Sequence, residues 1–277
     1  MGEARLKEVA SRFKVPGFLD YRGLIGLAEA VSIAVPTILH HQIARDFLLQ
    51  GVDVLVEKPI AETVEEAEDL VEVAKANGRL LQVGHIERFN GAVRALEVLV
   101  VEPGFIECHR LSPFVGRATD VDVVLDLMIH DIDVILSLVK SGVKAVSAVG
   151  VPVISDQVDI ANARIQFESG CVANVTASRV SMERMRKIRI FQKDTYLSLD
   201  FATLEIALYR RIPPDSPHGL PRIVKEEVSI DKAEPLQVEL GSFIDCVRNR
   251  KRPLVSGEEG RDALKVAFQI LQKLHAR

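Results

Sequence analysis

Short apolar runs and longer amphipathic stretches alternate along the first 84 residues. Continuous apolar, β-branched runs are typical of strands buried in a parallel sheet, and they occur here at residues 30–35, 52–56 and 80–84. Helical spacing predicts helices over residues 3–13, 21–28, 38–50 and 64–77. Thr37 is positioned to cap the third of these, and Thr63 with Glu66 forms a capping-box pattern for the fourth. The strand–helix–strand–helix–strand order predicts an α/β fold with a Rossmann-like, doubly wound parallel sheet.

The pattern changes after Gly84. Helices are predicted at residues 90–99, 121–139, 235–249 and 258–275, and strands at 104–111, 144–150, 160–167, 171–178, 186–192, 196–200 and 204–209. Glu168-Ser169-Gly170 joins two of these strands as a hairpin turn, whereas the Pro-rich residues 211–221 predict a loop. The chain therefore divides into a partial dinucleotide-binding domain, residues 1–86, and an α+β domain, residues 87–277. We expect the second domain to carry an open, mostly antiparallel sheet, and its C-terminal helix to pack back on the first domain.

Composition narrows the class of protein. The 277 residues carry 35 basic and 39 acidic side chains, for a net charge of −4, which gives no positive field for nucleic acid. No apolar run is long enough to span a membrane. Three widely spaced cysteines argue against a disulfide framework and favour a reducing compartment, so we expect a cytoplasmic location.

Lys58 is the first candidate for chemistry. Glu57-Lys58-Pro59 ends the second predicted strand, and ligands of doubly wound sheets bind at the carboxyl ends of the strands. A lysine there can hydrogen-bond a hydroxyl group or transfer a proton. The alternative is a solvated lysine at a strand end.

The second candidate is a polar stripe on the helix predicted at 121–139. Asp126, His130 and Asp133 recur at positions i, i+4 and i+7, which share one helix face. A carboxylate one turn from an imidazole orients it and raises its pKa, as suits a general acid or base. The same residues could bind a metal ion, but no third ligand cluster supports a metal site, and a helix with its polar face in water is the plain alternative.

The third candidate is the segment that follows the third predicted strand, at the domain boundary. It includes the polar residues His85, Glu87, Arg88 and Asn90. Domain boundaries favour ligand sites, and these side chains suit a polyhydroxylated ligand. The alternative is a polar linker.

Together the three motifs resemble the family of glucose–fructose oxidoreductase, inositol dehydrogenase and MocA-like dehydrogenases. Val35-Pro36-Thr37 with His40 is similar to the family's strand-end segment beside the cofactor, and Glu57-Lys58-Pro59 to its signature tripeptide. The spacing from Asp126 through His130 to Asp133 is similar to its catalytic helix, although family members usually have glycine at the position of Met128. Residues 82–90 look most like the members that act on nucleotide-linked amino sugars, of which UDP-N-acetylglucosamine 3-dehydrogenases are the nearest kind.

The resemblance implies hydride transfer between NAD or NADP and a hydroxyl-bearing carbon of a sugar, within a homo-oligomer such as a dimer or tetramer. It implies that Lys58 binds the reacting hydroxyl, that His130 is the general base and that Asp126 lies near the substrate. The cofactor would contact Pro36, Thr37, His40, Glu57 and Lys58, and the substrate His85, Arg88, Asn90 and Asp126. The Lys58–Pro59 bond is expected to be cis, as is frequent in related enzymes.

One expected motif is missing. A complete dinucleotide-binding domain begins with a strand, a G-x-G-x-x-G loop and a helix that hold the pyrophosphate, and this sequence contains no such loop. We therefore expect a sheet that lacks its first β–α–β unit and exposes a strand edge. Binding of the cofactor is then weakened, and a non-catalytic sugar-binding or assembly protein is the alternative function. A metal-dependent hydrolase that uses His130 and the aspartates is a third.

Overall fold

The computed structural model describes residues 2–114, 116, 121–214 and 220–275 and divides into two compact units. Unit 1 holds the chain up to Gly84 together with residues 242–258, and unit 2 holds residues 85–241 and 259–277. Among the described residues, no helix is both long and apolar enough to cross a bilayer.

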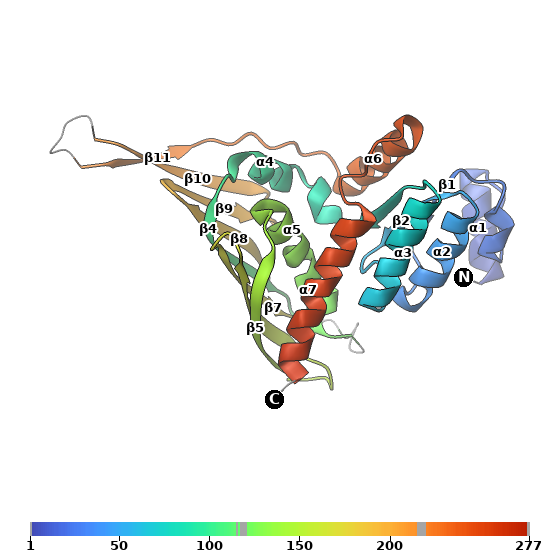
Figure 1. The fold of residues 1–277 in the computed structure, drawn as a ribbon, viewed down its shortest axis with the longest axis horizontal. Coiled ribbons are helices and arrows are strands. Elements are labelled where there is room, and N and C mark those ends of the chain that lie inside the picture. The colour runs from blue at the N-terminus through green and yellow to red at the C-terminus, as the bar shows by residue number, and fades with distance from the viewer. Residues whose placement is uncertain (1, 115, 117–120, 215–219, 276–277) are drawn as a thin grey trace. The chain divides into compact units, whose positions relative to one another are not determined.

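Unit 1 is built on a three-stranded parallel sheet. Its strands are β1 (Ala30–Ile33), β2 (Asp53–Glu57) and β3 (Leu81–Gly84), in that order across the sheet. The connecting helices α2 (His40–Leu49) and α3 (Val64–Ala76) lie side by side against it (Figure 1). Since the neighbouring strands are parallel, their carboxyl ends meet at one edge of the sheet.

Local signals in the sequence explain some of the element boundaries of unit 1 and miss others. Thr63 and Glu66 form the predicted capping box at the start of α3, with each side chain bonded to the other residue's backbone N–H. The first helix, α1 (Glu3–Phe13), has the predicted bounds. The helix predicted at 21–28 is only a 3₁₀ turn, Tyr21–Leu24. The predicted cap at Thr37 is also wrong, because a 3₁₀ turn over Thr37–Leu39 precedes α2 and no side chain caps it.

Strand β1 is less buried than its apolar sequence predicts. Only Ile33 of its four residues is buried, and Ser32 is exposed. The reason is its place in the sheet: β1 pairs with β2 on one side and with no described strand on the other. The exposed strand edge that the sequence predicts is therefore present in the described part of the chain.

Unit 2 is built on an eight-stranded sheet of mixed direction. Its order is β11-β10-β9-β8-β4-β7-β6-β5, with bounds β4 (Pro103–Leu111), β5 (Val143–Val151), β6 (Ile160–Phe167), β7 (Val172–Ser178), β8 (Met185–Gln192), β9 (Thr195–Asp200), β10 (Glu205–Ile212) and β11 (Arg222–Glu226). The β4–β7 pair is parallel and the other pairs are antiparallel. The loop predicted at 211–221 is partly wrong, because β10 continues to Ile212; residues 215–219 of that loop lie outside the described residues.

Helices cover one face of this sheet. They include α4 (Gly91–Leu99) and α5 (Ile129–Val139), which pack against each other, and α5 also contacts β4 and β7 (Figure 1). Burial alternates along the strands, as in β6, where every second residue from Ala161 to Phe167 is buried. Two further helices, α6 (Pro235–Asn249) and α7 (Gly257–His275), close the chain.

The helix predicted at 121–139 has two parts. Residues Val124–Met128 form a π-helical turn, and the regular helix α5 starts only at Ile129. A hydrophobic pattern cannot distinguish these forms, because both place apolar side chains on the inner face. π-turns inside helices are frequent at functional sites, and this one carries Asp126.

Candidate active site

Lys58 lies directly after β2, at the carboxyl edge of the sheet in unit 1. It is half-buried, and its backbone N–H donates to Oε2 of Glu57 at 3.3 Å. The Lys58–Pro59 peptide bond is cis, as expected. Lys58 is therefore placed where doubly wound sheets bind their ligands.

Gly84 brings β3 unusually close to the Glu57 side chain. The two residues are register partners, and a Cβ atom at Gly84 would lie 3.0 Å from Oε2 and 3.2 Å from Cα of Glu57. Glycine at this position thus leaves room for the Glu57 carboxylate beside Lys58. The ends of β2 and β3, which the sequence predicts to face a cofactor, therefore lie next to each other at the carboxyl edge of the sheet.

His40 links two of these strand ends. Its buried ring lies 2.8 Å (Nδ1) from the carbonyl oxygen of Pro59 and 2.9 Å (Nε2) from that of Val35. Both partners are carbonyl acceptors, so the ring is held between the two strand ends by its nitrogen atoms. Pro36 and Thr37 follow Val35 directly, and Thr37 begins the 3₁₀ turn before α2.

In unit 2, His130 is the second residue of α5, and Asp126 lies in the π-turn that precedes it. Both side chains are half-buried. The ring of His85, which is 1% exposed, stands edge-on to the His130 ring with centroids 6.4 Å apart. The structure thus brings two of the predicted polar segments of unit 2 together around His130.

Asp133, the third member of the polar stripe, is buried rather than solvated. Its Oδ1 lies 3.6 Å from Nη1 of Arg88, whose Nε donates to Glu97 at 3.0 Å. Oδ2 of Asp133 has no hydrogen-bond partner among the described residues. Burial raises the pKa of Asp133 to about 7; Arg88 opposes the shift, and Glu259 and Glu97 add to it.

The raised pKa of Asp133 predicts a pH-dependent stability. The unfolded side chain has a pKa near 3.9, so the folded state holds its proton more tightly, and stability falls as the pH rises from about 4 to about 7. Asp133→Asn cannot ionise. The melting temperature of the variant minus that of the wild type should therefore be larger at pH 8 than at pH 5. Asp133 and the exposed Asp262 line one cavity of about 500 Å³, and Asp262→Asn is therefore the control. If the difference in melting temperature between Asp133→Asn and the wild type is the same at both pH values, the prediction is wrong.

A buried ion network next to His130 was not predicted from the sequence. Asp131 accepts two hydrogen bonds from Arg110 of β4, Nε to Oδ2 and Nη2 to Oδ1, both 2.8 Å long. The remaining Nη1 of Arg110 donates to Glu87 at 3.3 Å. Burial lowers the pKa of Arg110, but Asp131 and Glu87 more than offset it, so the pKa stays above its usual value. The charged fork fixes α5 on the sheet one residue beyond His130.

The other predicted substrate ligands have partners within the protein. Asn90 caps α4 by accepting the backbone N–H of Ala92 at 3.0 Å, and Arg88 is bonded to Glu97 as described above. Sequence spacing could have indicated the cap of α4 but not the pairing of Arg110 with Asp131, since the partners lie on different elements. The substrate roles of His85, Arg88, Asn90 and Asp126 stay predictions.

Comparison with known proteins supplies the family. The family model described as "Oxidoreductase family, NAD-binding Rossmann fold" matches residues 1–85, and the model of the "GFO/IDH/MocA C-terminal domain" matches residues 89–196. The chain belongs to the GFO/IDH/MocA oxidoreductase family. This confirms the resemblance inferred from the Lys58 and His130 motifs, and it favours an NAD(P)-dependent oxidoreductase over the metal-dependent hydrolase.

Characterised relatives of this GFO/IDH/MocA member act on sugars and cyclitols. The chain is 36% identical to the UDP-N-acetylglucosamine 3-dehydrogenase of Acidithiobacillus ferrooxidans over 267 residues, which are 96% of this chain and 85% of that protein. It is 28% identical to the scyllo-inositol 2-dehydrogenase (NAD(+)) of Bacillus subtilis over 255 residues, 87% of this chain and 73% of that one. A structure of the Acidithiobacillus enzyme superposes with a TM-score of 0.92 at 34% identity, covering 99% of this chain and 88% of the other.

Proposed function

We propose that this chain oxidises a ring hydroxyl of a nucleotide-linked amino sugar, with UDP-N-acetylglucosamine as the first candidate. The observation that carries the proposal is the 36% identity along 96% of the chain to an enzyme with that substrate. The motifs agree with it, because Lys58, Asp126 and His130 occur in this sequence in the order and spacing of the family's reaction residues.

In the proposed reaction, the substrate hydroxyl loses its proton and its carbon loses a hydride, which leaves a ketone. The ammonium group of Lys58 donates a hydrogen bond to the reacting oxygen. The imidazole of His130 takes the hydroxyl proton as general base, and Asp126 stabilises the imidazolium that forms. When bound, the nicotinamide of NAD or NADP supplies the hydride acceptor.

The carboxyl edge of the three-stranded sheet fits the nicotinamide end of such a cofactor. Pro36, Thr37, Glu57 and Lys58 are placed along that edge, and His40 supports it through the carbonyl groups of Val35 and Pro59. Gly84 keeps the same edge free of a further side chain. These residues would hold the nicotinamide end of the cofactor. None of the motifs named above is assigned to the pyrophosphate.

Turnover of defined sugars tests the proposal. We expect reduced nicotinamide to accumulate when the protein is mixed with UDP-N-acetylglucosamine and NAD or NADP. Free N-acetylglucosamine should have a kcat/KM at least about tenfold lower, since the nucleotide contributes binding energy remote from the reacting carbon. Preference for myo-inositol would contradict the substrate assignment, and no turnover of any sugar would favour a non-catalytic binding protein.

We also infer that a second copy of this chain covers the open face of the eight-stranded sheet. A row of aromatic rings crosses four neighbouring strands, with centroids 5.0–6.0 Å apart; it consists of Phe105, Phe191, Tyr196 and Tyr209. Phe191 is 39% exposed, and aromatic residues are enriched at interfaces. Sedimentation should report a dimer or tetramer, and a monomer would refute this.

All three cysteines are buried and free, which agrees with the proposed cytoplasmic location.

A further inference from the structure

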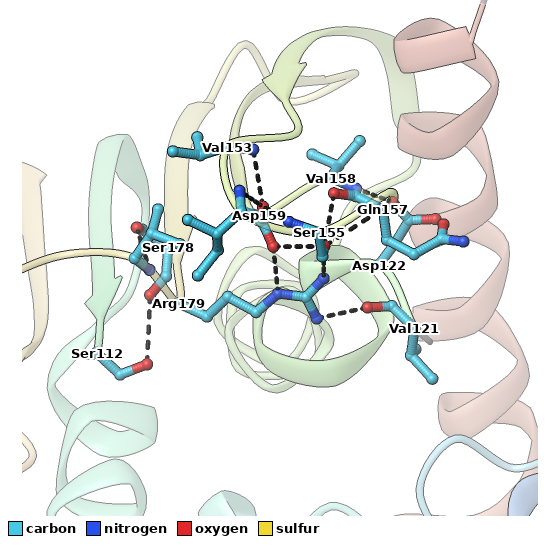
Figure 2. Close-up of polar contacts among 12 residues, drawn as sticks. Ser112, Val121, Asp122, Val153, Ser155, Gln157, Val158, Asp159, Ser178 and Arg179 are labelled. Atoms are coloured by element: carbon cyan, nitrogen blue, oxygen red, sulfur yellow. Dashed lines mark hydrogen bonds and ion pairs between the residues drawn. The ribbon is translucent and has the colours of Figure 1, made fainter. Parts of the chain in front are cut away.

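A buried ion pair joins the ends of two strands in unit 2. The carboxylate of Asp159, just before β6, accepts backbone N–H groups of Val153, Ile154 and Ser155 at 2.7, 2.7 and 3.0 Å on Oδ2. Its Oδ1 accepts the hydroxyl of Ser155 at 2.7 Å and Nε of Arg179, just after β7, at 2.8 Å (Figure 2). Asp159 is fully buried and Arg179 is 4% exposed.

The same cluster reaches a third segment. Nη1 of Arg179 donates to the carbonyl oxygen of Val121 at 2.6 Å (Figure 2). Beside it, Oδ1 of Asp122 accepts the backbone N–H of Val158 at 3.0 Å, and the N–H of Val123 donates to the carbonyl oxygen of Val158 at 3.1 Å. Three consecutive residues, 121–123, are therefore tied to the β5–β6 loop and to the end of β7.

These tied residues begin the π-turn. Val123 is the residue that precedes Val124–Met128, and the carbonyl oxygen of Asp122 accepts the N–H groups of Leu125 and Asp126, each at 3.1 Å. A π-turn holds one more residue per hydrogen-bonded ring than an α-turn. If the turn relaxed to α-helical geometry, Asp126 would rotate relative to His130.

The charges within the cluster balance each other. Burial alone would raise the pKa of Asp159, but the N–H of Ile154 and the guanidinium of Arg179 outweigh it and hold the pKa well below its usual range. The carboxylate is thus ionised over the working pH range, and its charge is balanced by Arg179. A buried pair with this many hydrogen bonds is a rigid anchor.

We propose that Asp159 and Arg179 are positioning residues, which fix residues 121–123 and so hold the π-turn that places Asp126 relative to His130. The inference rests on the proposed function, because it assigns Asp126 and His130 to the reaction. It adds two buried residues that no family motif in this sequence includes.

Arg179→Lys tests the link to residue 121 while keeping a positive charge beside Asp159. Lysine lacks the planar fork that serves Asp159 and Val121 together. We expect kcat to fall about tenfold to a hundredfold, since small misplacements of catalytic groups cost this much. KM and the affinity for the reduced nicotinamide cofactor should stay within about threefold, because the proposed substrate and cofactor contacts remain. Amide hydrogen exchange at Leu125 and Asp126 should become faster.

Ser155→Ala is the matched control. It removes hydroxyl contacts to Asp159, Arg179 and Gln157 but none of the bonds to residues 121–123. Its melting temperature should fall, whereas kcat should stay within about twofold. If Ser155→Ala loses as much kcat as Arg179→Lys, the cluster acts only through stability and the proposal is wrong.

A second pair of variants tests the same idea without touching the ion pair. Asp122→Asn keeps an acceptor oxygen for the N–H of Val158, and Asp122→Ala removes it. We expect the asparagine variant to retain kcat and the alanine variant to lose it together with exchange protection at Leu125. Unchanged exchange in Asp122→Ala and Arg179→Lys refutes the anchoring. If the variants exchange faster but keep the wild-type kcat, the positioning role is refuted. If the variants exchange faster but the wild-type protein itself is inactive, the result counts against the proposed function instead.

Discussion

Replacing His130 with alanine is expected to lower turnover by about 10²–10⁴-fold, the usual contribution of a general base. The imidazole takes the hydroxyl proton in the proposed reaction, and no other described side chain on the solvent-accessible part of α5 can replace it. Lys58→Ala is expected to reduce kcat/KM by a similar factor, since the variant loses the hydrogen bond to the reacting oxygen. Steady-state rates with UDP-N-acetylglucosamine measure both effects.

Matched controls exist within unit 1. His41 is a histidine on α2 whose Nε2 lies 2.7 Å from Asp69, and Lys75 is an exposed lysine in the last turn of α3. His41→Ala and Lys75→Ala should keep rates close to those of the wild type. If His130→Ala or Lys58→Ala also stayed within a few fold of the wild-type rate, the assigned roles would have to be abandoned.

Arg110→Ala is expected to destabilise the protein by about 3–5 kcal/mol, the typical cost of removing one partner of a buried ion pair. The reason is the carboxylate of Asp131, which is 2% exposed and would lose both of its hydrogen bonds to the guanidinium. The expected signature is a lower midpoint of urea-induced unfolding with an unchanged slope.

The control for Arg110→Ala is a more exposed ion pair, between an arginine and a glutamate on neighbouring strands of the eight-stranded sheet. Arg189 of β8 donates to Glu107 of β4 at 2.7 Å, but both side chains are partly exposed, at 38% and 32%. Arg189→Ala should cost at most about 1 kcal/mol, because solvent screens such pairs. Equal losses in the two variants would show that burial does not strengthen the Arg110 pair. The double variant Arg110→Met, Asp131→Leu should recover part of the stability, since the buried carboxylate of Asp131 is removed together with its partner. Recovery should be incomplete, because Glu87 still loses its hydrogen bond from Arg110.

The sequence was sufficient for features that depend on local pattern. The capping box of α3, the parallel strand–helix alternation of unit 1 and the hairpin at Gly170 all follow from residues close together in the chain. The family resemblance also came from local motifs at Lys58 and His130. These signals work because caps, turns and periodicity are set by backbone geometry within a few residues.

Features that depend on distant partners were not predicted. The π-turn at Val124–Met128 has the same inward apolar positions as an α-helix, so its distinct geometry appears only when residues 121–123 meet the β5–β6 loop. Likewise, Asp133 has the sequence spacing of a solvated or catalytic carboxylate, yet packing buries it against Arg88. β11 was missed because its five residues, four of them exposed, form a strand only by pairing with β10.

The place of β4 in the sheet has a consequence for how the protein is made. β4 pairs with β7 in parallel and with β8 on its other side, so its neighbours are synthesised long after it. The stretch that carries Asp126 and His130 lies between β4 and β7 in the chain and packs on both. On the ribosome, this helix therefore has no completed surface to fold against until β7 and β8 have emerged. Pairings between strands so far apart in the sequence slow folding. We therefore expect unit 2 to fold slowly and the helix that carries His130 to become ordered late.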